Sequence, residues 1–234
     1  MRARADLIMK QFGFYFATHP GDNHLAVRLA RQITSHHPGL PIAVTFDGSP
    51  GRGVCAILQQ LGCRVFPSRP MKRWQDGGKG AERNYSNALT LGADVLIQLD
   101  PDSYLHRPLP LETAPDAPWF GKLLEVKANP QPRAFTTLHG ACWGIAADSL
   151  QQIIDSGLLQ DPLYRGENKS DGTWAFNTPY GWRASHDLIT GDVAGRIGIK
   201  PQEWVEVAGG LKNYQEFFPQ PSQWPVTHPV KASH

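Results

Sequence analysis

Short apolar runs and amphipathic stretches alternate from residue 12 to residue 99, and this alternation limits the fold more than any other feature of the sequence. The apolar runs have the length of buried strands and lie at 12–17, 41–46, 63–66 and 95–99. The stretches between them predict helices at 24–35, 52–62 and 81–92. Strands that alternate with helices indicate βαβ crossovers. The sequence therefore predicts an α/β fold with a mainly parallel, Rossmann-like sheet and helices on both faces.

The alternation stops near residue 105, where the proline-rich connection PLPLETAPDAPW begins at residue 108. We expect one continuous domain over residues 1–234. Its first half, 9–109, is predicted to bind a nucleotide. Its second half, 110–234, is more irregular and is predicted to bind a second substrate.

Composition excludes several classes of protein. Lys and Arg total 23 against 21 Asp and Glu, so the chain lacks the basic excess of a nucleic-acid-binding protein. The N-terminal segment has only broken apolar runs, and no run reaches the ~18 apolar residues of a membrane span. The 3 cysteines form no CxxC motif, which argues against a disulfide scaffold. We expect a soluble, cytoplasmic protein with reduced thiols and no transmembrane segment.

Two aspartates, Asp100 and Asp102, follow the run at 95–99 directly. Carboxylates this close repel each other, and a divalent cation between them removes the repulsion. Their hard oxygen ligands suit Mg²⁺ or Mn²⁺. The alternative is a solvated turn, because Asp-Pro-Asp-Ser also favours turns.

Other polar residues also follow predicted strands. They are Thr18, His19 and Asp47. In parallel sheets, ligands bind at the carboxyl ends of the strands, so these side chains are candidates for the same site. Each of them also suits an ordinary turn.

The segment 78–109, GKGAERNYSNALTLGADVLIQLDPDSYLHRPL, resembles the nucleotide-sugar glycosyltransferases of the GT-A fold. In that family an Arg-Asn pair opens a helix of small residues, and the next strand delivers a DxD motif that binds the metal. The resemblance implies these roles for Arg83, Asn84, Asp100 and Asp102. It also implies that Thr18, His19 and Asp47 contact base and ribose, and Lys79 adds a charge for the diphosphate.

Two later segments are similar to parts of the same family. LHGACWGIAADSL, 138–150, resembles the segment before the acceptor region, and His139 and Trp143 are its candidate sugar contacts. SHDLITGDVAGRIGIKP, 185–201, resembles the segment that supplies the catalytic base of inverting members. Asp192 matches that base, with Arg196 as a helical partner. Gly191 departs from the family's acidic pair, Asp187 is a competing base, and an N-cap role is the alternative for Asp192.

The C-terminal segment THPVKASH contains His228 followed by Lys231. In several metal-dependent members of this family, a C-terminal histidine binds the cation and a lysine binds the diphosphate, in the same order. A neutral imidazole can bind Mn²⁺. The alternative is a solvated tail.

The resemblance implies a metal-dependent hexosyltransferase that uses Mn²⁺ or Mg²⁺. It would move a sugar from a UDP- or GDP-sugar to a hydroxyl of a glycan or small-molecule acceptor, with inversion. One alternative is a nucleotidyltransferase that makes sugar nucleotides, although THPGDNH contains only one glycine after the first strand. The other is a non-catalytic module that binds a nucleotide or sugar.

Overall fold

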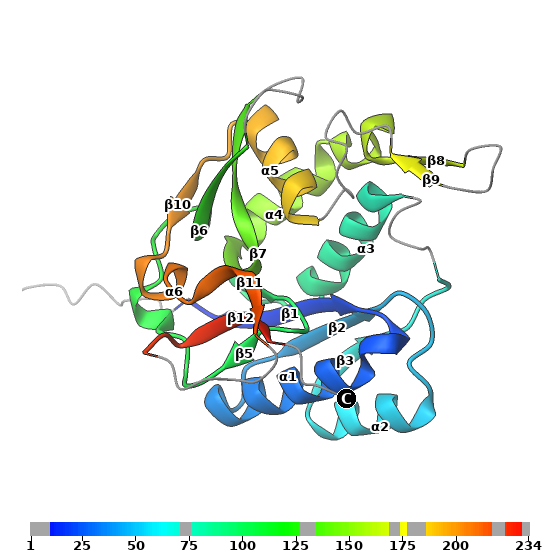
Figure 1. Cartoon of the computed structure of the whole chain (residues 1–234), viewed down its shortest axis with the longest axis vertical. Coiled ribbons are helices and arrows are strands. Elements are labelled where there is room, and N and C mark those ends of the chain that lie inside the picture. Colours follow the sequence, from blue (N-terminus) through cyan, green and yellow to red (C-terminus); the bar gives the residue numbers. More distant parts are fainter. Residues whose placement is uncertain are drawn as a thin grey trace, which may run out of the picture.

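The computed structural model describes residues 10–70, 76–126, 134–168, 174–176, 186–216 and 223–230 (Figure 1). The α-helices are α1 Asn23–His36, α2 Arg52–Gln60, α3 Gly77–Leu89, α4 Ala147–Asp155, α5 His186–Arg196 and α6 Val205–Ala208. Short 3₁₀ helices are η1 Pro20–Asp22, η2 Leu111–Thr113, η3 Leu158–Gln160 and η4 Pro162–Tyr164. The strands of the main sheet are β1 Phe12–Thr18, β2 Ile42–Phe46, β3 Cys63–Phe66, β4 Val95–Leu99, β6 Trp119–Val126, β7 Phe135–Ala146 and β10 Pro201–Glu203. The remaining strands are β5 Tyr104–Leu105, β8 Gly166–Asn168, β9 Trp174–Phe176, β11 Leu211–Glu216 and β12 Val226–Val230.

The main sheet has the order β10-β6-β7-β4-β1-β2-β3 in the described part of the chain. β1 is parallel to β2 on one side and to β4 on the other, and β2 is parallel to β3. Strand order therefore reverses at β1. Open α/β sheets bind ligands at the carboxyl ends of the strands beside such a reversal.

Helices cover both faces of this sheet, as the sequence predicts. On β4, Ile97 and Leu99 point to the face covered by α1 and α2, and Leu96 points to the face covered by α3, α4 and α5 (Figure 1). This alternation follows from the two-residue period of a strand. Both faces of the central strands are buried, which explains why their sequences read as continuous apolar runs.

The predicted strands and helices of the first half are confirmed within a few residues. The largest difference is α3, which begins at Gly77, four residues before the expected 81. Asp76 caps this helix, because its side chain accepts a hydrogen bond of 3.0 Å from the backbone N–H of Lys79.

The second half of the chain is more regular than the sequence predicts. β7 is antiparallel to both β4 and β6, so the sheet is mixed and continues through this half of the chain. The βα rhythm stops at residue 105 because antiparallel neighbours need no helical crossover. β10 then adds to the edge, parallel to β6.

A search of the described helices finds none with the length and apolar character needed to cross a bilayer. The three cysteines, Cys55, Cys63 and Cys142, are free thiols, as the sequence predicts.

Candidate metal centre and its surroundings

A tight turn at the end of β4 presents Asp100 and Asp102. The N–H of Ser103 donates to the carbonyl of Asp100 at 2.9 Å, which closes the turn around Pro101. The turn is fastened to β7, because the N–H of Asp100 and the hydroxyl of Ser103 both donate to the carbonyl of Ala141. Ser103 is fully buried. The turn expected as an alternative to a metal site is therefore present, and it holds both carboxylates in place.

The C-terminal strand β12 brings His228 to this turn. β5 pairs antiparallel with β12, with Tyr104 opposite Thr227, and β11 pairs with β12 on its other side. His106 reinforces the pairing, because its Nε2 lies 2.9 Å from the hydroxyl oxygen of Thr227. His228 is thus part of a short sheet, which rules out the solvated tail expected as its alternative.

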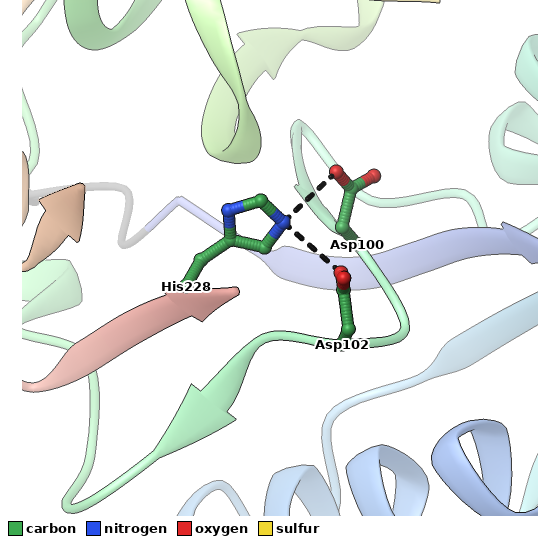
Figure 2. A group of neighbouring side chains, drawn as sticks. All are labelled: Asp100, Asp102 and His228. Atoms are coloured by element: carbon green, nitrogen blue, oxygen red, sulfur yellow. Dashed lines mark ion pairs between the residues drawn. The ribbon is translucent and has the colours of Figure 1, made fainter. Parts of the chain in front are cut away.

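Asp100, Asp102 and His228 converge at the carboxyl edge of the main sheet (Figure 2). His228 Nε2 lies 3.0 Å from Asp102 Oδ1 and 3.6 Å from Asp100 Oδ2. One nitrogen and two carboxylate oxygens lie within 4.8 Å of one another. The His228 side chain is only 15% exposed, whereas Asp100 exposes 39% of its side chain to a ligand.

The charges in this cluster perturb one another. The pKa of Asp100 is raised to about 7, mainly by desolvation. Asp102 and Asp187 also raise it, whereas His228 and the hydrogen bond from Gln98 lower it. Burial disfavours the His228 imidazolium, but the hydrogen bond to Asp102 and the nearby carboxylates outweigh burial and raise its pKa. A positive charge between the two aspartates is therefore stabilised.

The same three side chains fit a divalent cation. Two carboxylates and an imidazole are a ligand set suited to Mn²⁺, and the carboxylates alone suit Mg²⁺. Mg²⁺ typically keeps one or two protein carboxylates and fills its remaining positions with water and phosphate oxygens.

His139 lies next to the cluster. Its ring centroid is 5.4 Å from that of His228, with the rings nearly perpendicular. Its Nδ1 accepts a hydrogen bond of 3.2 Å from the N–H of Ala141. Because Nδ1 is the acceptor, the neutral ring carries its proton on Nε2. The residue is only 8% exposed.

Asp187 lies in the first turn of α5 and faces the cluster. Its charge acts on both Asp100 and His228. The backbone carbonyl of Asp187 accepts a hydrogen bond of 2.6 Å from Thr137, which ties α5 to β7. A Cβ at Gly140 would lie 3.1 Å from Asp187 Oδ2, so a small residue leaves room for this carboxylate.

The structure corrects the prediction for Asp192. This carboxylate is 1% exposed and accepts a hydrogen bond of 2.5 Å from the hydroxyl of Tyr164. Its expected partner Arg196 pairs instead with Asp161, at 2.8 Å. Asp192 lies in the interior of α5, so the N-cap alternative is also wrong. Of the two candidate bases, Asp187 is the one whose charge acts on Asp100 and His228.

Two predicted nucleotide contacts meet between the end of β2 and the middle of α3. Arg83 donates to Asp47 at 3.4 Å, and both side chains are largely buried. Asn84 follows Arg83 and is 2% exposed, and its Oδ1 has no hydrogen-bond partner among the described residues. Thr18 ends β1 next to them, with its carbonyl accepting from the N–H of Asp47 at 2.8 Å.

Three other predicted nucleotide contacts are not shown to join this group of residues. His19 pairs with Asp22 at 2.9 Å and caps η1, so its contacts are local. Lys79 lies 3.6 Å from Asp76, at the N-terminus of α3. Lys231 lies outside the described residues.

Trp143 contradicts its predicted role as a sugar contact. It is 1% exposed and packs edge-on against Tyr15, Tyr85 and Trp119. On β7, Trp143 lies opposite Gln98 of β4, in the interior of the sheet. Its side chain packs in the core between the sheet and α3.

Two residues near the cluster were not singled out from the sequence. Gln98 donates to Asp100 Oδ1 at 3.1 Å, and the two-residue period of β4 could have indicated that it shares a face with Asp100. Arg28 on α1 is close enough to Asp102 to feel its charge. No sequence pattern links this helix to the turn after β4.

Comparison with known proteins returned no matching family model and no matching curated protein.

Proposed function

We propose that this protein is a metal-dependent glycosyltransferase with a GT-A-like fold, which transfers a sugar from a nucleoside diphosphate sugar to an acceptor hydroxyl. The observation that carries the proposal is the convergence of Asp100, Asp102 and His228 at the switch point of the sheet. This is the position at which an α/β sheet of this type binds a nucleotide.

Asp100, Asp102 and His228 would hold Mn²⁺ or Mg²⁺. When bound, the cation neutralises negative charge on the departing nucleoside diphosphate. Arg83, whose guanidinium lies 3.4 Å from Asp47 after β2, would offer planar N–H donors to the diphosphate. Lys231 follows His228 in the chain and is a further candidate for the diphosphate.

Asp187 is the proposed general base. Its carboxylate takes the proton of the acceptor hydroxyl as that oxygen attacks the anomeric carbon. The new carbon–oxygen bond forms while the bond from that carbon to the diphosphate oxygen breaks, and the electron pair leaves with the diphosphate. Direct attack of this kind inverts the anomeric centre.

His139 would donate from Nε2 to an oxygen of the donor. Its tautomer is fixed by the N–H of Ala141, and its ring lies against that of His228. Such a preorganised donor costs little reorganisation during the reaction.

Titration calorimetry with UDP and GDP, with and without Mn²⁺, tests the proposal. We expect nucleotide binding that requires Mn²⁺ in the native chain and is lost in Asp102→Asn. Asp116→Asn is the matched control, since its carboxylate pairs with Lys10 and is 96% exposed. Metal-independent binding, or full binding by Asp102→Asn, would reject the proposed metal role.

Product analysis separates transfer from binding alone. Incubation with UDP- or GDP-hexoses and Mn²⁺ should release nucleoside diphosphate, and release should stop in Asp187→Asn. Metal-dependent binding without any release would identify a non-catalytic module instead.

A further inference from the structure

A second pocket lies on the opposite face of the sheet from α3. It has a volume of about 570 Å³ and lies between α1, the start of α2 and Tyr104. This volume is in the range of small-molecule sites. Figure 1 shows α1 running beneath β5, the strand that carries Tyr104.

The charged residues that line this pocket are all basic. They are His24, Arg28 and Arg31, and no carboxylate is among the lining residues. The three lie on one face of α1, and the like charges of Arg28 and Arg31, three residues apart, destabilise a helix at this spacing. α1 itself contains no Asp or Glu, and Asp102, which follows β4, offsets part of this repulsion at Arg28. A bound anion would offset more of it.

Arg28 is held in a fixed position at the pocket wall. Its guanidinium donates to the carbonyl of Ser103 at 3.2 Å and lies 5.5 Å from the centre of the Tyr104 ring. Gln32 of α1 also contacts the segment that contains Ser103 and Tyr104, because its Oε1 accepts a hydrogen bond of 3.3 Å from the N–H of Leu105. A guanidinium fixed in this way loses little entropy when it binds a phosphate.

The rest of the lining is partly apolar. Val27, Val54 and Tyr104 line the pocket together with the amides of Asn23 and Gln32. This combination suits a ligand that has an anionic group at one end and a ring or hydrocarbon at the other.

We propose that this pocket binds a phosphate-bearing ligand that carries a ring. It is a second site, because its helical wall is α1, whereas Arg83 lies on α3 and Asp187 on α5, the helices that cover the other face of the sheet. The two sites share one wall, since Asp102, Ser103 and Tyr104 are consecutive. The second site needs no metal.

NMR titration of ¹⁵N-labelled protein in EDTA, at constant ionic strength, tests this site. We expect inorganic phosphate and phenyl phosphate to shift amides of α1 and Tyr104 saturably, with phenyl phosphate binding more tightly. Arg31→Gln should weaken both at least fivefold, and Tyr104→Leu should remove the preference for phenyl phosphate. Arg52→Gln is the matched control, because Arg52 is an exposed arginine on α2 that does not line the pocket.

Vesicle sedimentation identifies the source of the phosphate. Vesicles of phosphatidylcholine with and without phosphatidic acid should leave the protein in solution if the ligand is a free phosphate compound. Binding to the phosphatidic acid vesicles that Arg31→Gln removes would identify a lipid headgroup at the same site. Shifts that do not saturate, or equal affinities in Arg31→Gln and Arg52→Gln, would overturn the site. EDTA keeps this outcome independent of the metal centre.

Discussion

His228 Nε2 lies 3.0 Å from Asp102 Oδ1, although Asp102 follows the fourth strand and His228 belongs to the last one. The pairing of β5 with β12 produces this contact, since β5 begins two residues after Asp102. The short strands next to the main sheet therefore complete the candidate metal centre.

Replacement of His228 should change which metal the protein prefers. Imidazole contributes more to the binding of Mn²⁺ than of Mg²⁺, which favours oxygen ligands. We expect His228→Gln to lower Mn²⁺ affinity by roughly tenfold or more, with a smaller loss for Mg²⁺. Calorimetry with each metal measures this. Equal losses for both metals would indicate that His228 does not bind the cation.

Asp187 and Asp192 should respond differently to the same substitution. Asp187→Asn removes the proposed base and should lower the turnover of sugar transfer by about 10²-fold or more, while metal and nucleotide binding persist. Asp192→Asn should leave turnover largely unchanged and lower the free energy of unfolding by about 1 kcal/mol, because the bond from Tyr164 becomes neutral. A loss of turnover in Asp192→Asn alone would restore Asp192 as the base.

Trp143 should matter for stability. It is 1% exposed within a cluster of aromatic rings, so Trp143→Ala leaves a large cavity. We expect a loss of about 3–5 kcal/mol in the free energy of unfolding, measured with urea. Trp143→Phe should lose less and should keep nucleotide binding. Unchanged stability with weakened sugar binding would contradict the core position.

His37 should make the fold sensitive to acid. Burial lowers the pKa of His37 to about 4, His36 lowers it further, and Glu112 opposes them. Its Nε2 accepts a hydrogen bond of 2.9 Å from the N–H of Leu109, which only the neutral ring can do. The unfolded chain takes up this proton near pH 6.5 and the folded chain near pH 4, so stability falls as the pH drops through this interval.

The matched variant for this effect is His37→Gln, whose amide oxygen can accept the same hydrogen bond without titrating. Between pH 7.5 and 4, the native chain should lose roughly 2 kcal/mol more stability than His37→Gln. Urea unfolding at a series of pH values measures the difference. Identical pH profiles would show that His37 does not titrate in this interval.

The sequence predicted the first half of the fold well because each element there carries its own local signal. β1, β2 and β4 are buried on both faces and read as apolar runs, and α1 shows the spacing of an amphipathic helix. β6 and β7 were not recognised. Their antiparallel pairing brings no crossover helix with it, so the alternation that indicated the other strands is absent.

The sequence could predict those residues of the candidate site that directly follow a strand. Asp47 and Asp100 come directly after strands, and parallel strands bring such residues to one edge. The roles of Trp143 and Asp192 were not predictable, because both depend on which face of an element is buried. Arg28 depends on the packing of α1 against β5, a contact between distant segments that leaves no local pattern.

Anomalous diffraction from a crystal soaked in Mn²⁺ tests the central claim most directly. The account predicts one strong anomalous peak between Asp100, Asp102 and His228, within bonding distance of the Nε2 of His228 and absent from Asp102→Asn. A saturating soak that leaves this position without a peak, while His228 stays paired with Asp102, would contradict the account.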